Sequence, residues 1–269
     1  MNRTSSIGVF DSGLGGLTVL QALKRQLPGE SLIYFGDTAR VPYGTKSAET
    51  VIHFSEQIVK FLLNRDVKMV VVACNTASSV ALRKLQQMNE IPIIGVIEPG
   101  AKSAINTTQS NHIGVIGTTA TIHSNSYTKV LKSINPEINV TEIPCPLFVP
   151  LVEEGWIDGS VPEMVAESYL APFADKDVDT IILGCTHYPI LKQTIKRVLP
   201  EGVSLIDSAD AVSIEVKSKL QELNLLAVET EKPHHLECFV TDLPQKFEEL
   251  SRRFLGQDLP DVKLVTGDW

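Results

Sequence analysis

The sequence predicts an α/β protein made of two similar lobes, each a mainly parallel sheet flanked by helices, with an active site in the crevice between them. Short runs rich in β-branched residues alternate with longer segments of helical period, which is typical of βαβ units. The same order of segments occurs twice along the chain. Two cysteines end equivalent strands of the two series, at the edge where ligands bind in open α/β sheets.

The first series contains four expected strands, each followed by an expected helix. The helix over 47–64 is the most strongly indicated, because its apolar side chains recur at three- and four-residue spacing. Strands joined through helices run parallel, so both faces of the sheet should be covered. The expected strands are IGVF (7–10), LIYFG (32–36), MVVVAC (69–74) and IPIIGVI (91–97), and the expected helices cover 16–27, 47–64, 77–89 and 99–108.

The second series repeats this order and indicates an internal duplication. Gly8 lies 66 residues before Cys74, and Gly114 lies 71 residues before Cys185. Two independent domains of one common type would give the same weak similarity, because a common fold recurs in unrelated proteins. The expected elements are the strands HIGVIGT (112–118), NVTEIP (139–144) and DTIILGC (179–185), with helices at 120–134 and in stretches through 173.

The last part of the chain is expected to complete the first lobe. After residue 207 the pattern predicts a helix to about 224, a strand LECFVTD and a further helix near 245–255. The predicted division is therefore 1–97 plus 208–269 for the first lobe and 98–207 for the second.

Composition and charge exclude several classes of protein. A chain of 269 residues with 43% hydrophobic residues can bury a large core, while a net charge of −8 without a Lys/Arg block argues against a nucleic-acid partner. The start of the chain lacks the pattern of a signal peptide, and no stretch approaches the roughly 20 apolar residues of a membrane span. We therefore expect a cytoplasmic protein with no membrane partner. Its four cysteines are widely separated and are expected to be free thiols.

A glycine-rich turn, FDSGLGGLTVL, follows the first strand and places Asp11 and Ser12 at the sheet edge. It is not a dinucleotide fingerprint, because that pattern needs a third glycine where this chain has Thr18. Asp11 is either a turn or cap former or a residue that faces a ligand. In the loop GDTARVPYGTKS, Tyr43 before Gly44 is most simply a loop anchor.

The two strand-end cysteines, Cys74 and Cys185, indicate chemistry rather than core filling because they occupy matching positions. In the segment CTH, residues two apart point to the same side of a strand, so Cys185 and His187 are expected to share a cavity. An imidazole beside a thiol can hold or exchange its proton. An alternative interpretation is a mononuclear zinc site, in which the same two cysteines and His187 are the ligands and Asp11 is a carboxylate that supports these ligands without contacting the metal. Cys145 and Cys238 are expected to be structural.

Two thiols suit one kind of reaction in particular. A nucleophilic cysteine enzyme needs one thiol, so a second in the mirror position is surplus to that mechanism. Inversion of a stereocentre needs one group to take a proton from carbon while another delivers a proton to the opposite face. One thiolate and one thiol would be the resting arrangement.

Five ordered motifs together carry a resemblance to a known family. IGVFDSGLGGLTVL, YFGDTARVPYGTKS, ACNTAS, GVIEPG and LGCTHYP resemble the cofactor-independent glutamate racemases of the aspartate/glutamate racemase family, from residue 7 to about 210. The resemblance implies interconversion of L- and D-glutamate without cofactor or metal, supply of D-glutamate for cell-wall peptidoglycan, and a homodimer.

The resemblance also implies roles for individual residues. Cys74 and Cys185 would be the two bases, with Cys74 serving the D-enantiomer. Asp11 would assist Cys74, and His187 would assist Cys185. Thr118 and Thr121 are further candidates for holding a carboxylate. The implied substrate contacts are Asp11, Ser12, Tyr43, Gly44, Asn75, Thr76, Thr186 and His187.

Three rival functions stay open at this point. An aspartate racemase would use the same two thiols and would turn over the shorter dicarboxylate at a comparable rate. A non-catalytic protein with two lobes that close on an amino acid would keep its ligand binding after loss of either cysteine. A zinc hydrolase would lose its activity after exhaustive chelation.

Overall fold

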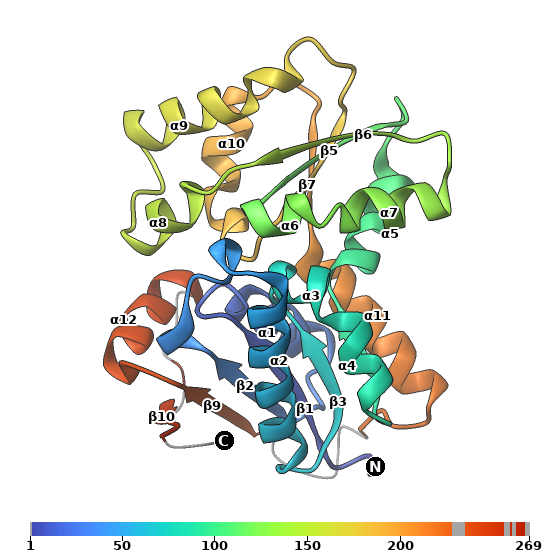
Figure 1. Ribbon diagram of the computed structural model, residues 1–269, viewed down its shortest axis with the longest axis vertical. Helices are drawn as coiled ribbons and strands as arrows, with labels where there is room; N and C mark the ends of the chain where they lie inside the picture. The colour runs from blue at the N-terminus through green and yellow to red at the C-terminus, as the bar shows by residue number, and fades with distance from the viewer. Residues whose placement is uncertain (1, 228–234, 256–258, 260–261, 267–269) are drawn as a thin grey trace.

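The computed structural model describes residues 2–227, 235–255, 259 and 262–266. Its strands form two parallel sheets, one in each lobe, as the sequence predicts (Figure 1). The first sheet contains β1 (Ser6–Asp11), β2 (Leu32–Gly36), β3 (Val67–Val72), β4 (Ile93–Gly95), β9 (Leu236–Val240) and β10 (Val262–Leu264). The second contains β5 (His112–Gly117), β6 (Asn139–Pro144), β7 (Thr180–Gly184) and β8 (Ser204–Asp207).

The two sheets share one strand order. Four neighbouring strands of the first sheet are ordered β2-β1-β3-β4, and the strands of the second sheet are ordered β6-β5-β7-β8. The two orders are the same when β1 to β4 are matched in turn with β5 to β8. Strands β9 and β10 extend the first sheet beyond β2. Under this equivalence β3 matches β7, so Cys74 and Cys185 follow matching strands.

Helices cover both faces of each sheet. The long helices are α1 (Leu17–Gln26), α2 (Ala48–Leu63), α5 (Ile97–Thr107), α7 (Ser126–Ile134), α9 (Ser160–Leu170), α11 (Ser208–Glu222) and α12 (Pro244–Leu255). The short ones are α3 (Asn75–Val80), α4 (Leu82–Met88), α6 (Thr119–His123), α8 (Phe148–Glu153) and α10 (Lys192–Val198), with the 3-10 turns η1 (Thr38–Arg40), η2 (Tyr43–Thr45), η3 (Ala171–Phe173) and η4 (Tyr188–Leu191).

Two of the expected helices are broken in the structure. The segment expected as one helix over 77–89 forms α3 and α4, which meet at Ala81. The segment expected over 120–134 forms α6 and α7, because Asn125 adopts a φ of 53°. This left-handed conformation ends a helix, and asparagine tolerates it better than most residues do.

Four apolar layers hold the helices to the sheets. In the first lobe α1 and α11 pack on one face of the sheet, and α2 with α3 and α4 packs on the other. In the second lobe α8, α9 and α10 cover one face, and α5 with α7 covers the other. The predicted apolar face of α2 is confirmed, since Val51, Ile58 and Leu62 are completely buried.

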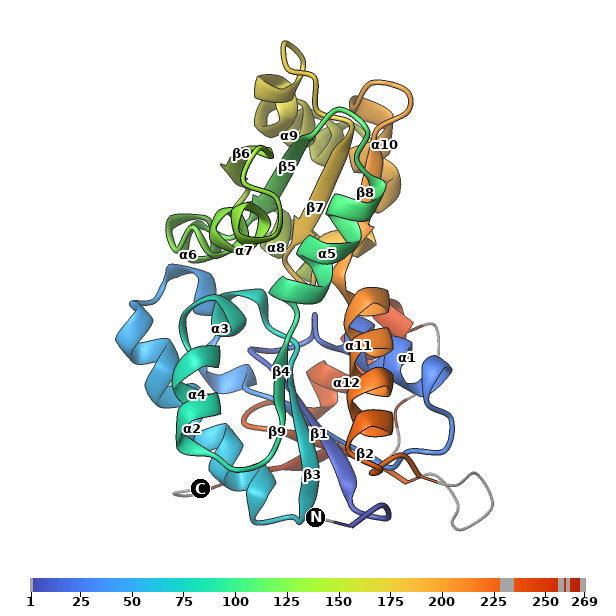
Figure 2. The same cartoon turned by 90° about the vertical axis from the view of Figure 1, so that its right-hand side faces the viewer.

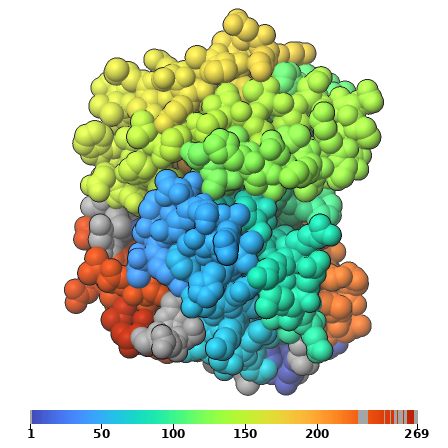
Figure 3. All heavy atoms as spheres, in the orientation of Figure 1, coloured from blue at the N-terminus to red at the C-terminus, as the bar shows by residue number. Residues whose placement is uncertain are grey.

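The lobes lie one above the other, and the chain crosses between them where α5 and α11 begin (Figure 2). The space-filling view shows the second lobe seated directly on the first (Figure 3). The carboxyl ends of β1 and β3 in one lobe and of β5 and β7 in the other converge on the junction, because residues just after all four strands line one cavity there. Within the described residues, no helix is long and apolar enough to cross a lipid bilayer.

Candidate active site

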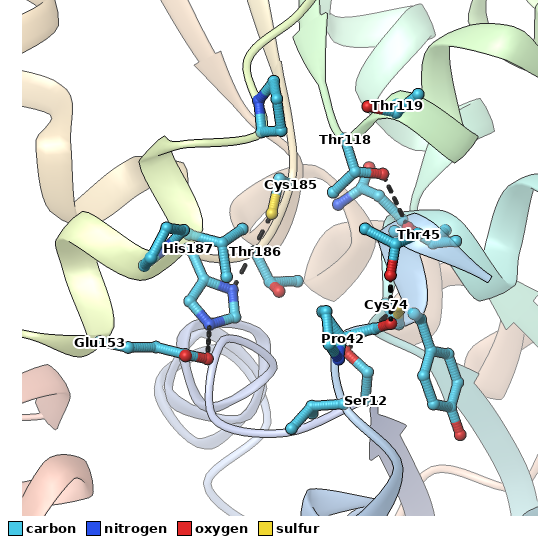
Figure 4. Close-up of a pocket in the computed structure, with 18 residues that line it drawn as sticks. Ser12, Pro42, Thr45, Cys74, Thr118, Thr119, Glu153, Cys185, Thr186 and His187 are labelled. Atoms are coloured by element: carbon cyan, nitrogen blue, oxygen red, sulfur yellow. Dashed lines mark hydrogen bonds and ion pairs between the residues drawn. The ribbon is translucent and has the colours of Figure 1, made fainter. Parts of the chain in front are cut away.

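A cavity of about 320 Å³ lies between the lobes at the ends of these four strands. Figure 4 shows Cys185 and Cys74 on opposite sides of it, one from each lobe. Its volume suits a small ligand such as an amino acid. The lining residues are Ser12, Val41, Pro42, Tyr43, Gly44, Thr45, Cys74, Asn75, Thr76, Thr118, Thr119, Pro146, Val149, Pro150, Glu153, Cys185, Thr186 and His187.

Cys74 is held at the start of α3, directly after strand β3. Its sulfur accepts a hydrogen bond from the Ala77 backbone N–H at 3.5 Å, and its thiol donates to Ser12 Oγ at 3.7 Å. Burial, followed by the nearby carboxylate of Asp11, raises the pKa of Cys74 to about 12. Without a ligand, Cys74 is therefore a thiol at neutral pH and can give a proton to a neighbouring atom.

Cys185 is paired with an imidazole. His187 Nδ1 lies 3.9 Å from Cys185 Sγ, and His187 Nε2 lies 3.3 Å from Glu153 Oε1, so the ring bridges the thiol and the carboxylate (Figure 4). Burial opposes the charged ring, but the hydrogen bonds to Cys185 and Glu153 outweigh it and raise the pKa of His187 to about 10. The ring is therefore an imidazolium at neutral pH, beside the second thiol.

Asp11 lies behind the cavity wall. It is completely buried, it is not among the lining residues, and Thr186 Oγ1 donates to its Oδ1 at 3.3 Å. The backbone N–H of Gly13 donates to its other oxygen at 2.9 Å. Burial raises the pKa of Asp11, against the attraction of the His187 imidazolium. Asp11 thus connects the glycine-rich turn of one lobe to the CTH segment of the other.

The glycine-rich turn brings the two lobes into close contact. A Cβ atom on Gly15 would lie 2.1 Å from Thr186 Oγ1 and 2.6 Å from His187 Nδ1. No side chain fits there, so glycine is required for the turn to approach the CTH segment. Gly15 therefore serves contact between the lobes, whereas a Cβ on Gly13 or Gly16 would meet residues of the first lobe itself.

Tyr43 lines the cavity, but its hydroxyl is turned toward the first lobe. The hydroxyl donates to the carboxylate of Asp37, which also receives Arg40 Nε at 2.7 Å. Gly44 faces the second lobe, because a Cβ there would lie 2.7 Å from Thr118 Cβ. The prediction of Tyr43 as a loop anchor agrees with these contacts, and Gly44 marks a close approach of the lobes.

One wall of the cavity is a cluster of hydroxyl and amide groups from both lobes. Thr76 Oγ1 lies 2.9 Å from Thr118 Oγ1 and 3.2 Å from Thr121 Oγ1. Asn75 precedes Thr76 in the same wall. Among the lining residues that the structure describes, none is Lys or Arg, so an anionic ligand would be held by neutral donors and the His187 imidazolium.

Glu153 is the one ionisable residue among the described lining residues that the sequence did not predict for the site. It lies at the end of α8 in the segment FVPLVEEG, far from every recognised motif. A single glutamate in a helix carries no signal of its own, because most such residues are solvated. Only the fold shows that it lies beside His187.

The other two thiols differ in how near they lie to this chemistry: burial and then Cys185 raise the pKa of Cys145, whereas Cys238 lies in β9 of the first lobe. Cys145 and Cys238 are buried and free, and neither lines the cavity. Within the described part of the chain, no group of three or more His, Cys, Asp or Glu side chains is placed to hold a metal ion. The alternative of a zinc site at Cys74, Cys185 and His187 therefore gains no support.

Comparison with known proteins points to one family. The family described as Asp/Glu/hydantoin racemase matches residues 7–213. The glutamate racemase of Geobacter metallireducens is 52% identical over 261 residues, which cover 97% of this chain and 96% of that protein.

Solved structures agree with this result. A glutamate racemase from Bacillus anthracis superposes with a TM-score of 0.94 at 42% identity, and 98% of each chain is covered. The glutamate racemase from Francisella tularensis, solved in complex with D-glutamate, gives a TM-score of 0.92 at 43% identity with the same coverage.

Proposed function

The chain belongs to the Asp/Glu/hydantoin racemase family, and we propose that it interconverts L-glutamate and D-glutamate with Cys74 and Cys185 as the two bases. The D-glutamate made in this way supplies peptidoglycan biosynthesis. The observation that carries the proposal is the placement of two thiols from matching strands on opposite sides of one small cavity. The D-glutamate complex of the Francisella relative supports glutamate as the ligand.

The reaction requires one proton to leave the α-carbon and another to arrive on its opposite face. D-glutamate reacts with the form of the protein in which Cys74 has first given its proton to solvent and Cys185 is still a thiol. The thiolate of Cys74 then takes the α-proton, and the electron pair of that C–H bond stays on carbon. The thiol of Cys185 then delivers its proton to the other face, which gives L-glutamate and leaves Cys74 protonated. The reverse reaction starts from the Cys185 thiolate, so each thiol acts as acid in one direction and base in the other.

Neighbouring side chains assist each thiol. His187 bridges Cys185 and Glu153, so its imidazolium can stabilise the thiolate that forms when Cys185 gives up its proton. On the other side, burial and then the nearby Asp11 carboxylate raise the pKa of Cys74, which makes that thiolate a strong base once it forms. The two thiols therefore work in unequal electrostatic surroundings.

The acidity of the α-carbon is the difficult part of the reaction. Hydrogen bonds to the α-carboxylate must spread the charge that develops there, and exclusion of water strengthens them. The wall formed by Asn75, Thr76 and Thr118 offers neutral donors for a carboxylate, and Ser12 lies beside Cys74. Thr186 and His187 complete the proposed contacts on the other side.

We further propose how the chain divides into two lobes and that the protein is located in the cytoplasm. The first lobe takes residues 1–97 plus 208–269 and the second takes 98–207, since the crossings between the sheets fall near these positions. Four free thiols in an acidic chain fit the reducing cytoplasm.

We also propose that the protein is a homodimer. Apolar side chains are exposed along one stretch of the second lobe, and exposed apolar groups of this kind are typical of interfaces. They include Leu147, Trp156, Ile157, Val161 and Met164. Sedimentation of the unaltered protein as a dimer, and of Trp156→Ser as a monomer, would support this interface, whereas a monomeric unaltered protein would overturn it.

The proposed function is tested by polarimetry without added cofactor. Optical rotation should be lost from both pure L-glutamate and pure D-glutamate, and Cys74→Ser and Cys185→Ser should each lower kcat by more than about a thousandfold. Cys238→Ser, which changes a buried thiol in β9 outside the cavity, is the matched control and should stay active. Comparable turnover of aspartate would favour the rival racemase, and tight glutamate binding without turnover would favour a binding protein.

A further inference from the structure

A buried tyrosine of the second lobe reaches across to a cavity residue of the first. The hydroxyl of Tyr127, in α7, donates to Asn75 Oδ1 in α3 at 2.6 Å. Tyr127 is 1% exposed and Asn75 is 3% exposed, so this hydrogen bond is shielded from water. Asn75 also lines the cavity, whereas Tyr127 does not.

A third residue extends this hydrogen bond into a chain of three groups. Ser208 Oγ, at the start of α11, lies 3.3 Å from the Tyr127 hydroxyl. A tyrosine hydroxyl has one proton, so when that proton is given to Asn75 the oxygen must accept from Ser208. Gly100 permits this packing, because a Cβ there would lie 2.8 Å from Ser208 Oγ. The chain of donors runs from Ser208 through Tyr127 to the carbonyl of Asn75.

The hydrogen bond from Tyr127 determines which polar atom of the Asn75 amide is left to contact a ligand. Its carbonyl oxygen is occupied by Tyr127, and among the described residues its amide nitrogen has no hydrogen-bond partner. With the amide in the opposite orientation, a carbonyl oxygen would face the cavity and repel a carboxylate. The Asn75 amide nitrogen is instead a hydrogen-bond donor, which suits glutamate, the dicarboxylate substrate of the proposed function.

We propose that Tyr127 is a positioning residue, which holds the Asn75 amide with its nitrogen toward the cavity so that it donates to a carboxylate of the substrate. This inference rests on the proposed function for the identity of the ligand. It adds a residue outside the cavity, on the opposite lobe, that determines how the cavity recognises an anion.

The test compares Tyr127→Phe with the unaltered protein. The ring and its packing stay, and only the hydroxyl is lost. We expect the Kd for D-glutamate, measured by calorimetry, and the KM to rise about three- to tenfold, with a smaller change in kcat. Tyr169→Phe is the control, because its hydroxyl accepts a hydrogen bond from the Leu147 N–H outside the cavity. That variant should bind D-glutamate as the unaltered protein does.

A double-mutant cycle separates positioning from general loss of stability. If Tyr127 acts through Asn75, then adding Tyr127→Phe to Asn75→Ala should cause no further rise in Kd. A purely structural role would add its effect to that of Asn75→Ala. Equal Kd for Tyr127→Phe and the unaltered protein, or additive effects in the double variant, would overturn the proposal.

An isosteric substitution tests the polarity directly if Tyr127→Phe fails to fold. Asn75→Asp keeps an oxygen for Tyr127 but replaces the amide nitrogen with a second oxygen. We expect D-glutamate binding to weaken by about a hundredfold or more, and unchanged binding would contradict the proposal. Kd is measured in the Cys74→Ser background, in which D-glutamate is not turned over, so absence of racemisation in the unaltered protein would count against the proposed function and would leave the positioning test intact.

Discussion

At the scale of single residues, Gly15 has the least space for an added side chain. A methyl group there would lie within 2.6 Å of atoms of both Thr186 and His187, so the CTH segment would have to move. We expect Gly15→Ala to lower kcat/KM by about a hundredfold or more while the protein stays folded, because small displacements of catalytic groups are costly. Steady-state kinetics and circular dichroism check this.

The control for this substitution is another buried glycine. A Cβ on Gly8 would meet only side-chain methyl groups of Leu62 and Val67, at 3.1 to 3.3 Å. Gly8→Ala should therefore affect stability more than turnover. Loss of activity in Gly8→Ala equal to that in Gly15→Ala would show that contact with the CTH segment is not the cause.

The pKa of His187 predicts how stability depends on pH. Despite burial, its hydrogen bonds to Cys185 and Glu153 raise the folded-state pKa to about 10, compared with 6.5 for an unperturbed histidine. The ring's contribution to stability is complete below pH 6.5 and is lost as pH rises toward 10, because the folded state binds the proton more tightly.

Urea denaturation at pH 6, 8 and 10 measures this contribution. The free energy of unfolding should fall with rising pH by at least about 1 kcal/mol more in the unaltered protein than in His187→Asn. Identical pH dependence in the two proteins would mean that the ring is not an imidazolium in the folded state.

How far the sequence predicts the site depends on whether a residue lies in a motif. Cys74, Cys185 and His187 were recognisable because strand-end positions and two-residue spacing place them in one crevice. Glu153 and Tyr127 were not, since each lies in an ordinary helical segment and gains its role only through packing between lobes. Asp11 was predicted as a site residue, and its position behind the wall depends on side-chain packing that no motif encodes.

At the scale of elements, strand β3 contains a buried charge. Lys68, with a side chain 0% exposed, pairs with Glu30 at 2.6 Å and also donates to the carbonyls of Arg3 and Leu225. We expect Lys68→Met to lower the free energy of unfolding by about 3 to 5 kcal/mol, because Glu30 would be left as a buried, unpaired charge.

A second substitution should reverse most of this loss. Adding Glu30→Gln removes the stranded charge and keeps an oxygen to accept from the Ala227 N–H, which Glu30 Oε1 accepts at 2.8 Å. Both variants should racemise glutamate normally per folded molecule, as the pair does not line the cavity. Denaturant titration tests this, and a Lys68→Met variant as stable as the unaltered protein would contradict it.

Elements with a long apolar pattern were predicted well, and short ones were not. Helix α2 was expected over 47–64 and begins at Ala48, because Ser47 caps it by accepting from the Thr50 N–H. Strand β8 was missed, since four residues cannot show a period. The break between α6 and α7 depends on one backbone conformation at Asn125, which sequence alone does not determine.

At the scale of the whole molecule, the spacing of the lobes determines the shape of the site. Gly44 of the first lobe meets Thr118 of the second, and a Cβ on Gly44 would lie 2.7 Å from Thr118 Cβ. We expect Gly44→Ala to hold the lobes apart and raise KM about tenfold, with a smaller effect on kcat.

Small-angle scattering with saturating D-glutamate checks the cause. The radius of gyration of Gly44→Ala should exceed that of the unaltered protein, while Lys46→Ala, at the end of the same turn and outside the cavity, should match it. Equal radii together with a raised KM would place the effect in the loop rather than in the lobe spacing.

The duplication was predictable because both halves repeat the same order of strands and helices, with a cysteine after the third strand of each. The orientation of the lobes was not fixed by that pattern. It depends on contacts such as Gly15 with Thr186 and Asp11 with Thr186, which join residues far apart in the chain.

Deuterium incorporation during early turnover shows whether two different bases serve the two faces of the α-carbon. In heavy water, each thiol exchanges its proton with solvent, so the base that takes protium from the substrate differs from the acid that gives deuterium to the product. Starting from either enantiomer, we expect deuterium at the α-carbon of the product and almost none in the recovered substrate. Product that keeps the protium of its substrate, or deuterium entering substrate and product alike, would indicate a single base and would rule out the two-base mechanism.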